Sequence, residues 1–193
     1  MMKVNKLNKL KNGLYEVHID DDLLILDEET IIKYRLLIGK DILESDLKSI
    51  KLEDEINKLV NKCFQYSFKY KKSLNEVKRY LKEKNIDNDI IIRVIDILVE
   101  KKLIDDLSIA KDIASYLARN SNGKLLIQEK LKQRLFTSST INEAIESINE
   151  DDYKYGKYKI ILKLEKKYSK EEEKIRALKI KKQLYAHGYL GDD

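Results

Sequence analysis

The sequence predicts a mainly helical protein, in which tandem three-helix repeats form an elongated curved stack behind a small N-terminal β-hairpin and helix. Three observations predict this class. The chain of 193 residues contains no proline, the residue that most strongly interrupts a helix. Lys, Glu, Leu and Ile are abundant, and charged residues (38%) are interspersed with apolar ones (42%) at helical spacing. The same apolar pattern returns after about 50 residues, which indicates stacked repeats.

Residues 1–50 are expected to form a separate extension of a β-hairpin and a helix. Residues 15–19 alternate apolar and polar side chains, and an apolar run at 23–26 follows an acidic stretch, a pattern typical of a hairpin with an acidic turn. Residues 4–10 are expected to add a further strand. Asp27 then predicts the start of a helix that ends near Gly39.

The rest of the chain is expected to contain three helical repeats, at 51–104, 105–150 and 151–193. The first helix of each repeat is predicted at about 53–69, 105–120 and 151–168. The second helices share apolar positions on one face, followed by an apolar residue just past the helix end: Val77, Leu81 and Ile86; Ile127, Leu131 and Phe136; Ile180, Leu184 and Tyr189. The third repeat stops where its third helix should begin, so we expect it to be incomplete, through truncation or degeneracy.

Two acidic pairs occupy matching junctions between the repeats. Asp105 and Asp106 precede the first helix of the second repeat, and Asp151 and Asp152 precede that of the third. A catalytic dyad, half of a metal site and a helix cap are the three alternatives. Neither pair has a His, Cys or Gly-rich partner in the sequence, whereas a helix must begin at both places. The pairs are therefore predicted to be helix caps.

Other helix starts carry capping residues as well. Ser73 and Glu76 have the spacing of a capping box that opens the second helix of the first repeat. Asn88 and Ser138 lie at matching positions before the third helices and are predicted N-caps. These residues support helices in the predicted places without implying any chemistry.

A basic residue recurs near the end of each second helix, at Lys84, Arg134 and His187. The unpaired carbonyls at a helix C-terminus favour a nearby cation. The pattern therefore predicts that each of these side chains interacts with the end of its own helix.

Several classes of function are not expected from this composition. His18 lies on the polar face of a predicted strand with no second His or Cys nearby, so it is not expected to bind metal. Cys63 has no partner for a disulfide, is predicted to pack as a small apolar residue, and suits a reducing cytoplasm. The sequence contains no phosphate-binding loop and no apolar run long enough to span a membrane. We therefore expect no catalytic residue, metal, cofactor or membrane contact.

Positive charge is concentrated in two stretches, at residues 61–84 and 154–182, although the net charge is only +5. A lysine-rich face is usually a solvated helix surface. A run of such faces on successive helices makes nucleic acid, or a protein bound to nucleic acid, a more plausible partner.

Four motifs then occur in order along the chain. They are Lys72 followed by Ser73-Leu-Asn-Glu-Val77, Leu103-Ile-Asp-Asp-Leu-Ser-Ile-Ala110, Gly123-Lys-Leu-Leu-Ile127, and His187-Gly-Tyr189. With the acidic hairpin ahead of them, they resemble the motifs of the RecX family of recombination regulators, in the Gram-positive type with an N-terminal β extension. The resemblance spans nearly the whole chain, and the order of the motifs is more specific than any one of them.

The resemblance implies a non-enzymatic regulator that binds RecA, chiefly the RecA–DNA filament, and we expect it to be a cytoplasmic monomer. Such a protein modulates or inhibits the recombinase and ATPase activity of RecA, and with it DNA recombination, DNA repair and the SOS response. A weak direct contact with DNA is a further expectation. The candidate residues for contact with RecA or DNA are Lys69, Lys71, Lys72, Arg79, Arg119, Lys124, Lys130, Lys132, Lys181 and Lys182. The sequence does not divide them between RecA and DNA.

One alternative remains open, a stand-alone helical DNA-binding protein, because three-helix units resemble the cores of helix-turn-helix domains. That alternative predicts a recognition helix rich in Arg, Asn and Gln. The corresponding helix, predicted at residues 88–101, consists mostly of Ile and acidic residues.

Overall fold

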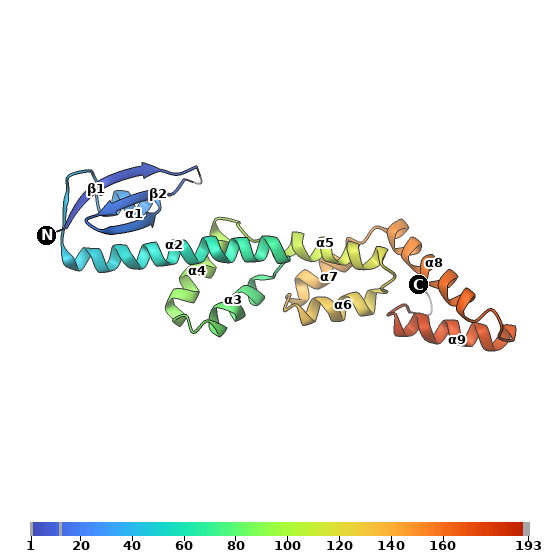
Figure 1. Cartoon of the computed structure of the whole chain (residues 1–193). Coiled ribbons are helices and arrows are strands. Elements are labelled where there is room, and N and C mark those ends of the chain that lie inside the picture. Colours follow the sequence, from blue (N-terminus) through green and yellow to red (C-terminus); the bar gives the residue numbers. More distant parts are fainter. Residues whose placement is uncertain (1, 12, 191–193) are drawn as a thin grey trace. The chain divides into compact units, whose positions relative to one another are not determined.

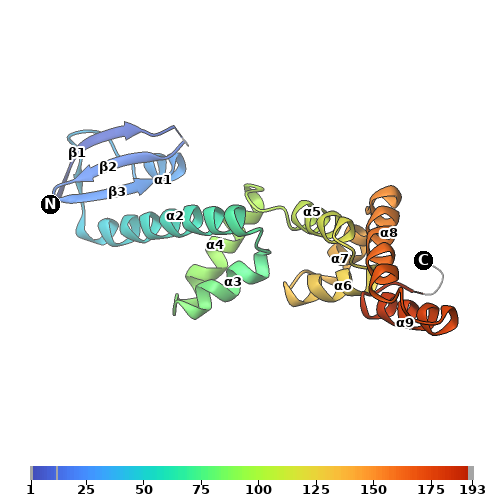
Figure 2. The ribbon, with the colours of Figure 1, turned by 45° about the vertical axis from the view of Figure 1, so that its right-hand side comes forward.

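The computed structural model of the protein describes residues 2–11 and 13–190 (Figure 1). The chain packs as two compact units. One consists of Met1–Phe68 with Tyr80–Leu103, and the other of Lys69–Arg79 with Ile104–Asp193. Figure 2 shows the same chain turned by 45°. Each unit contains a core of buried apolar side chains.

The first unit begins with a four-stranded antiparallel sheet of order β3-β2-β1-β4. Its elements are β1 (Met2–Lys9), β2 (Tyr15–Ile19), β3 (Asp22–Leu26), α1 (Glu28–Lys33) and β4 (Asp41–Ile42). The predicted hairpin and the strand before it are present, and Val17 and Ile19 are fully buried as their alternation indicated. The two-residue strand β4 was not predicted.

Helix α1 begins as predicted, because the Asp27 side chain accepts a hydrogen bond from the Thr30 amide. It ends at Lys33, however, and not near Gly39. Arg35 adopts a positive φ of 47°, and the Leu36 amide donates to the Ile31 carbonyl, which closes the helix. Leu36 is then completely buried in the core beneath the sheet.

The long helix α2 (Glu44–Tyr70, 27 residues) begins before the predicted position near residue 53. Its first turns are helical because Leu47 and Ile50 are buried in the core of the sheet. The Asp54 side chain also accepts a hydrogen bond of 2.6 Å from the Ile25 amide, on the edge strand β3. The predicted boundary near residue 50 therefore lies inside one continuous helix.

The remaining elements are helices. They are α3 (Leu74–Glu83), α4 (Asn88–Glu100), α5 (Asp106–Arg119), α6 (Lys124–Gln133), α7 (Ser138–Glu146), α8 (Glu150–Lys167) and α9 (Glu173–Ala186). The predicted class, mainly helical with a small N-terminal β extension, is confirmed. The division into repeats at 51–104, 105–150 and 151–193 stays a prediction. No described helix is both long and apolar enough to cross a membrane.

The core of the second unit depends on small residues in α5. Ala110, Ala114 and Ala118 are fully buried at a spacing of four residues, which gives α5 a smooth face for close packing. Gly156 of α8 lies against that face, and a Cβ there would be 2.0 Å from the Ala118 carbonyl oxygen. Ile127 and Leu131 of α6 are fully buried in the same core.

The predicted capping box is confirmed. Ser73 Oγ accepts from the Glu76 amide at 3.1 Å, and Glu76 Oε2 accepts from the Ser73 amide at 3.2 Å. The third helices begin one residue earlier than predicted, so the caps are Asp87 and Thr137 in place of Asn88 and Ser138.

Only one of the four aspartates in the two acidic pairs caps a helix. Asp105 caps α5, accepting from the Ser108 amide at 3.0 Å, as predicted. Asp106 instead accepts from the Leu74 amide at 2.8 Å, at the start of α3. The prediction for the second pair is wrong: Asn149 caps α8, and Asp151 and Asp152 lie in its first turn, where carboxylates still favour the positive helix end. None of these four carboxylates belongs to a group of three or more His, Cys, Asp or Glu that could hold a metal among the described residues.

Candidate partner-binding surface

Two turns of the second unit form hydrogen bonds with the starts of other helices. After α6, the turn at Arg134 and Leu135 contacts the start of α3. Ser73 Oγ donates to the Arg134 carbonyl at 2.7 Å, and Asn75 Nδ2 donates to the Leu135 carbonyl at 2.9 Å. Because these bonds join segments about 60 residues apart, they fix α3 to α6 independently of the core.

After α9, an equivalent turn contacts the start of α6. The Gly123 amide donates to the His187 carbonyl at 2.7 Å, and the Leu125 amide donates to the Gly188 carbonyl at 3.2 Å. The Gly-containing link and the His-Gly-Tyr ending, which were separate motifs in the sequence, therefore form one contact. Both bonds satisfy amides at a helix N-terminus that would otherwise lack an acceptor.

The sequence pattern predicts that the basic residues in these turns interact with the ends of their own helices. In the structure they contact the ends of other helices instead. Arg134 Nη2 donates to the carbonyls of Tyr70 (3.0 Å) and Lys71, where α2 ends. His187 Nδ1 lies 3.2 Å from the Ser121 carbonyl, just after α5. Each side chain thus stabilises the C-terminal end of a helix far away in the sequence. Arg134 is accordingly an anchor of the fold, a role that sequence reasoning missed.

Arg134 also neutralises a buried carboxylate. Glu76 is only 5% exposed, and its oxygens lie 2.7 Å from Lys72 Nζ and 3.5 Å from Arg134 Nε. A carboxylate in this position needs both cations and the Ser73 amide to replace its hydration. Lys72, a candidate contact residue, is therefore largely occupied within the protein.

Arg134→Met is expected to lower the free energy of unfolding by about 2–3 kcal/mol, because two carbonyls lose a charged donor and the buried Glu76 carboxylate loses one of its two cations. Urea unfolding followed by circular dichroism measures the change. Arg93→Met is the matched control, since the pair of Arg93 with Glu53 (2.7 Å) is partly exposed and should contribute about 1 kcal/mol or less. Equal losses of stability for the two variants would contradict the assignment of Arg134 as an anchor.

Asp106 is the second carboxyl group in this region with an unusual environment. Burial raises the pKa of Asp106, the hydrogen bond from the Leu74 amide lowers it, and the nearby Asp105 and Glu76 carboxylates raise it further. Because the folded pKa is higher than the ordinary 3.8, the native state binds more protons than the unfolded chain in the window just above that value. The contribution of Asp106 to stability is therefore full below the ordinary pKa and is lost as pH rises through the raised pKa.

Asp106→Asn is expected to leave the protein at least as stable as the wild type at pH 7, because Asn keeps an acceptor for the Leu74 amide and carries no charge. The advantage should shrink as pH falls through the raised pKa of Asp106 and should be gone well below the ordinary pKa of 3.8, where the carboxyl group is neutral in the folded and the unfolded chain. Urea midpoints between pH 3 and 7 measure this, with Asp106→Ala as the control that removes the acceptor. A destabilisation by Asp106→Asn that grows toward pH 7 would contradict this explanation.

Three of the candidate residues come together around one groove of the second unit. The groove, of about 630 Å³, lies between the end of α2, α5 and α6 and is here called the α5–α6 groove. It is lined by Lys69, Tyr70, Lys71, Asp112, Ile113, Tyr116, Leu117, Lys130, Gln133 and Arg134. Lys69, Lys71 and Lys130 thus share a site, although no sequence pattern groups them.

The three lysines of the groove differ in availability. Lys69 is exposed, with its ammonium 5.2 Å from the centre of the Tyr70 ring. Lys71 pairs with Asp112 at 3.1 Å on an exposed surface. Lys130 is half-buried and donates to Asn122 Oδ1 at 2.7 Å. Lys69 and Lys71 are therefore the lysines best placed to meet a partner, and Lys130 helps to hold a buried asparagine.

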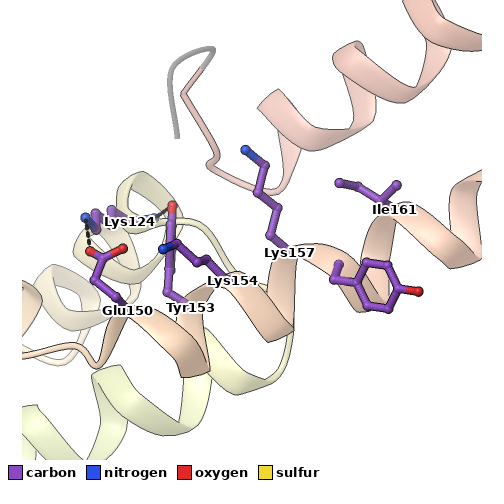
Figure 3. A pocket seen from close by; sticks show the side chains of 7 residues that line it. Lys124, Glu150, Tyr153, Lys154, Lys157 and Ile161 are labelled. Atoms are coloured by element: carbon purple, nitrogen blue, oxygen red, sulfur yellow. Dashed lines mark hydrogen bonds and ion pairs between the residues drawn. The ribbon is translucent and has the colours of Figure 1, made fainter.

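Lys124 lies in a different place, together with two lysines that sequence reasoning missed. Figure 3 shows this pocket, of about 550 Å³, which is here called the α8 pocket. It is lined by Lys124, Glu150, Tyr153, Lys154, Lys157, Tyr158 and Ile161. Lys124 of α6 and Glu150 of α8 point toward one another, with Nζ and Oε1 3.7 Å apart (Figure 3).

The α8 pocket combines ammonium groups with aromatic rings. Lys124 Nζ lies 5.0 Å from the centre of the Tyr153 ring, and Lys157 Nζ lies 5.9 Å from that of Tyr189. Tyr158 is 58% exposed. Three lysines against one glutamate leave the pocket positive, and an exposed ring beside it can stack on a planar group. The alternation of Lys and Tyr from 153 to 159 was the sequence signal for this site.

The other candidate residues lie outside both sites. Arg119 pairs with Asp152 at 3.2 Å, and Arg79, Lys132, Lys181 and Lys182 are exposed. Lys181 lines a third depression, of about 480 Å³, between α8 and α9. Six of the ten predicted contact residues therefore line neither the α5–α6 groove nor the α8 pocket.

The side chains that most often carry metal or redox chemistry are placed elsewhere. Cys63 is completely buried, as predicted, and burial raises the pKa of its thiol to about 11, which keeps it protonated and unreactive. His18 lies 3.1 Å from Glu16 on the polar face of β2.

Comparisons with known proteins give a consistent result. No family model matches the chain. It is 32% identical to the regulatory protein RecX of Clostridium tetani, across 100% of this chain and 88% of that protein. It is also 32% identical to the regulatory protein RecX of Lactococcus lactis subsp. cremoris, across 87% of this chain. The chain spans only 64% of the length of that second relative.

Two solved structures share the fold. A crystal structure of regulatory protein RecX matches 100% of this chain and 96% of its own, with a TM-score of 0.76 and 22% identity. The crystal structure of RecX from Lactobacillus salivarius matches 72% of this chain and 91% of its own, with a TM-score of 0.65 and 22% identity.

Proposed function

This chain belongs to the RecX family of regulatory proteins, and from this premise we propose that it binds RecA, chiefly the RecA–DNA filament, and inhibits its recombinase and ATPase activity. Membership in a family of regulators is the observation that carries the proposal. The protein acts by occupying the filament and makes or breaks no covalent bond. It works in the cytoplasm as a monomer, and it affects recombination, repair and the SOS response through RecA.

The two sites of the second unit suit a partner made of protein and DNA. The α8 pocket offers the ammonium groups of Lys124, Lys154 and Lys157 beside the exposed ring of Tyr158. Ammonium groups neutralise phosphates, and a tyrosine ring stacks on an unpaired base. The α5–α6 groove has an apolar interior, which suits a protein surface better.

The same pocket supports one second candidate, a stand-alone DNA-binding protein. That function needs a helix whose outward side chains read base edges. Helix α4 buries Ile91, Val94 and Leu98 and exposes Ile92 and Val99, so it offers no row of Arg, Asn or Gln. The composition of α4 therefore favours the RecA-dependent function over a stand-alone DNA-binding protein.

The proposal is tested by titrating the protein into RecA that hydrolyses ATP on single-stranded DNA. We expect the rate to fall as the protein approaches the concentration of RecA. The double variant Lys154→Glu/Lys157→Glu should require an excess of about tenfold for the same inhibition, since each reversal replaces an attraction by a repulsion.

The matched control is Lys163→Glu/Lys166→Glu, which makes the same charge change on exposed positions of α8 outside the pocket. It should inhibit RecA nearly as the wild type does. An unchanged ATPase rate at several-fold excess of wild-type protein would refute the proposed function. Equal inhibition by the two double variants would remove the α8 pocket from the interface.

A further inference from the structure

The α5–α6 groove has an apolar floor and aromatic walls. Ile113 and Leu117, both half-buried, lie in α5 and pack on the core of the unit. Tyr70 and Tyr116 line the groove with 52% and 64% of their surfaces exposed. A large apolar side chain placed here would be removed from water on several sides, which is the usual way in which a groove binds a peptide anchor.

The rim of the groove is positive. Lys69, Lys71, Lys130 and Arg134 line it, opposed by Asp112. Lys130 and Arg134 have buried partners in Asn122 and Glu76. Both side chains of the Lys71–Asp112 ion pair are exposed. Replacing the Asp112 carboxylate by a carboxylate of the partner, as the ion that pairs with Lys71, therefore changes the free energy little. Lys69 and Lys71 are therefore available to one or two carboxylates of a partner.

A nucleic-acid strand fits this groove poorly. The Asp112 carboxylate is 61% exposed on the rim and would repel phosphates, and only Lys69 and Lys71 offset it because Lys130 and Arg134 bind Asn122 and Glu76. The aliphatic floor of Ile113 and Leu117 has no donor for a phosphate or a sugar. Both features are compatible with a peptide, whose few carboxylates can avoid Asp112 while an apolar side chain covers the floor.

We propose that the α5–α6 groove docks an acidic segment of a partner protein, which inserts one large apolar side chain over Ile113 and Leu117 and pairs its carboxylates with Lys69 and Lys71. The identification of that partner as a protein of the RecA filament rests on the proposed function. The acidic and apolar character of the docked segment is inferred only from the residues that line the groove.

The direct test uses a short fluorescein-labelled peptide of Asp and Glu around a central Leu-Phe pair. Two probes accompany it, a peptide with Lys in place of every acidic residue and an oligothymidylate of similar length. We expect fluorescence anisotropy to show the acidic peptide binding at least about tenfold more tightly than either comparison probe. No binding of the acidic peptide up to about 1 mM, or tighter binding of the oligothymidylate, would overturn the proposal.

The double variant Lys69→Glu/Tyr116→Ala locates the binding. Both side chains are exposed, so the variant should fold normally, and its affinity for the acidic peptide should fall about tenfold or more. The matched control Lys163→Glu/Tyr155→Ala makes the same changes at exposed positions of α8. Equal affinities of the two variants would overturn the proposal, even if the peptide binds.

Repeating the measurement with RecA separates this inference from the proposed function. If RecA competes with the peptide for the wild type, both are supported. If the peptide binds in the groove and RecA neither competes nor is inhibited, the docking of an acidic segment is supported and the proposed function is contradicted. If RecA is inhibited equally by wild type and the Lys69→Glu/Tyr116→Ala variant, RecA is not the protein that docks in the groove.

Discussion

Gly188→Ala is expected to destabilise the second unit by about 3 kcal/mol or more. Gly188 has a φ of +82°, and a Cβ at this position would lie 2.4 Å from the Leu126 amide nitrogen. The positive φ costs about 1 kcal/mol for alanine, and the clash with backbone forces the turn away from α6 at a further cost of about 2 kcal/mol. The hydrogen bonds of the Gly123 and Leu125 amides to this turn should then break.

Gly39→Ala separates the two causes. Gly39 has a φ of +88°, but a Cβ there would have no atom within 4 Å, so only the backbone strain of about 1 kcal/mol remains. Hydrogen exchange with mass spectrometry should show faster exchange of the first amides of α6 in Gly188→Ala and unchanged exchange there in Gly39→Ala. Equal destabilisation in the two variants would show that the turn after α9 does not hold the start of α6.

Leu131→Ala is expected to lower the free energy of unfolding by about 2–5 kcal/mol. Leu131 is fully buried among Ile127, Phe136 and the alanines of α5. It also supports the turn after α6, where the Phe136 amide donates to the Leu131 carbonyl. The truncated side chain leaves a cavity that this backbone framework cannot easily close.

Leu125→Ala on the same helix is the control, because Leu125 is 41% exposed and its truncation should cost about 1 kcal/mol or less. Urea unfolding of both variants measures the difference. A change below about 1 kcal/mol for Leu131→Ala would show that α6 presents a different face to the core.

The fold class could be predicted because it depends on patterns within single elements. The alternation at 15–19 and the spacing of Val77 with Leu81 or Ile127 with Leu131 identify buried faces before any neighbour is known. Apart from Tyr15, the apolar residues of these patterns are all fully or almost fully buried. The length of α2 could not be predicted, because its first turns are helical through contact with the sheet.

The caps show where local patterns stop being sufficient. Ser73 and Glu76 bind each other within one turn, so the sequence contains the whole motif. Asp106 looks like Asp105 in sequence but accepts from the Leu74 amide, a role that depends on tertiary structure. At α8 the cap is Asn149, and sequence alone could not select it, since the two aspartates that follow are equally acceptable capping residues.

The candidate sites were the least predictable feature. Lys69, Lys71 and Lys130 meet only because α5 and α6 pack beside the end of α2, and nothing in a single sequence reports that juxtaposition. Charge alone also selected lysines with internal partners, such as Lys72 and Lys130. It missed Lys154 and Lys157 although tyrosines surround them in the sequence, because their position beside Lys124 becomes visible only once α6 and α8 are placed.

The most direct test of the proposed function compares two targets on the same immobilised single-stranded oligonucleotide, bare DNA and DNA coated with RecA. Biolayer interferometry at several salt concentrations gives the affinity and its salt dependence. We expect binding to the RecA filament to be at least about tenfold tighter than to bare DNA. Lys154→Glu/Lys157→Glu should reduce the log–log salt slope by about 0.7 for each phosphate that is no longer neutralised. Equal affinity for the two targets, or no binding to the filament, would contradict the account.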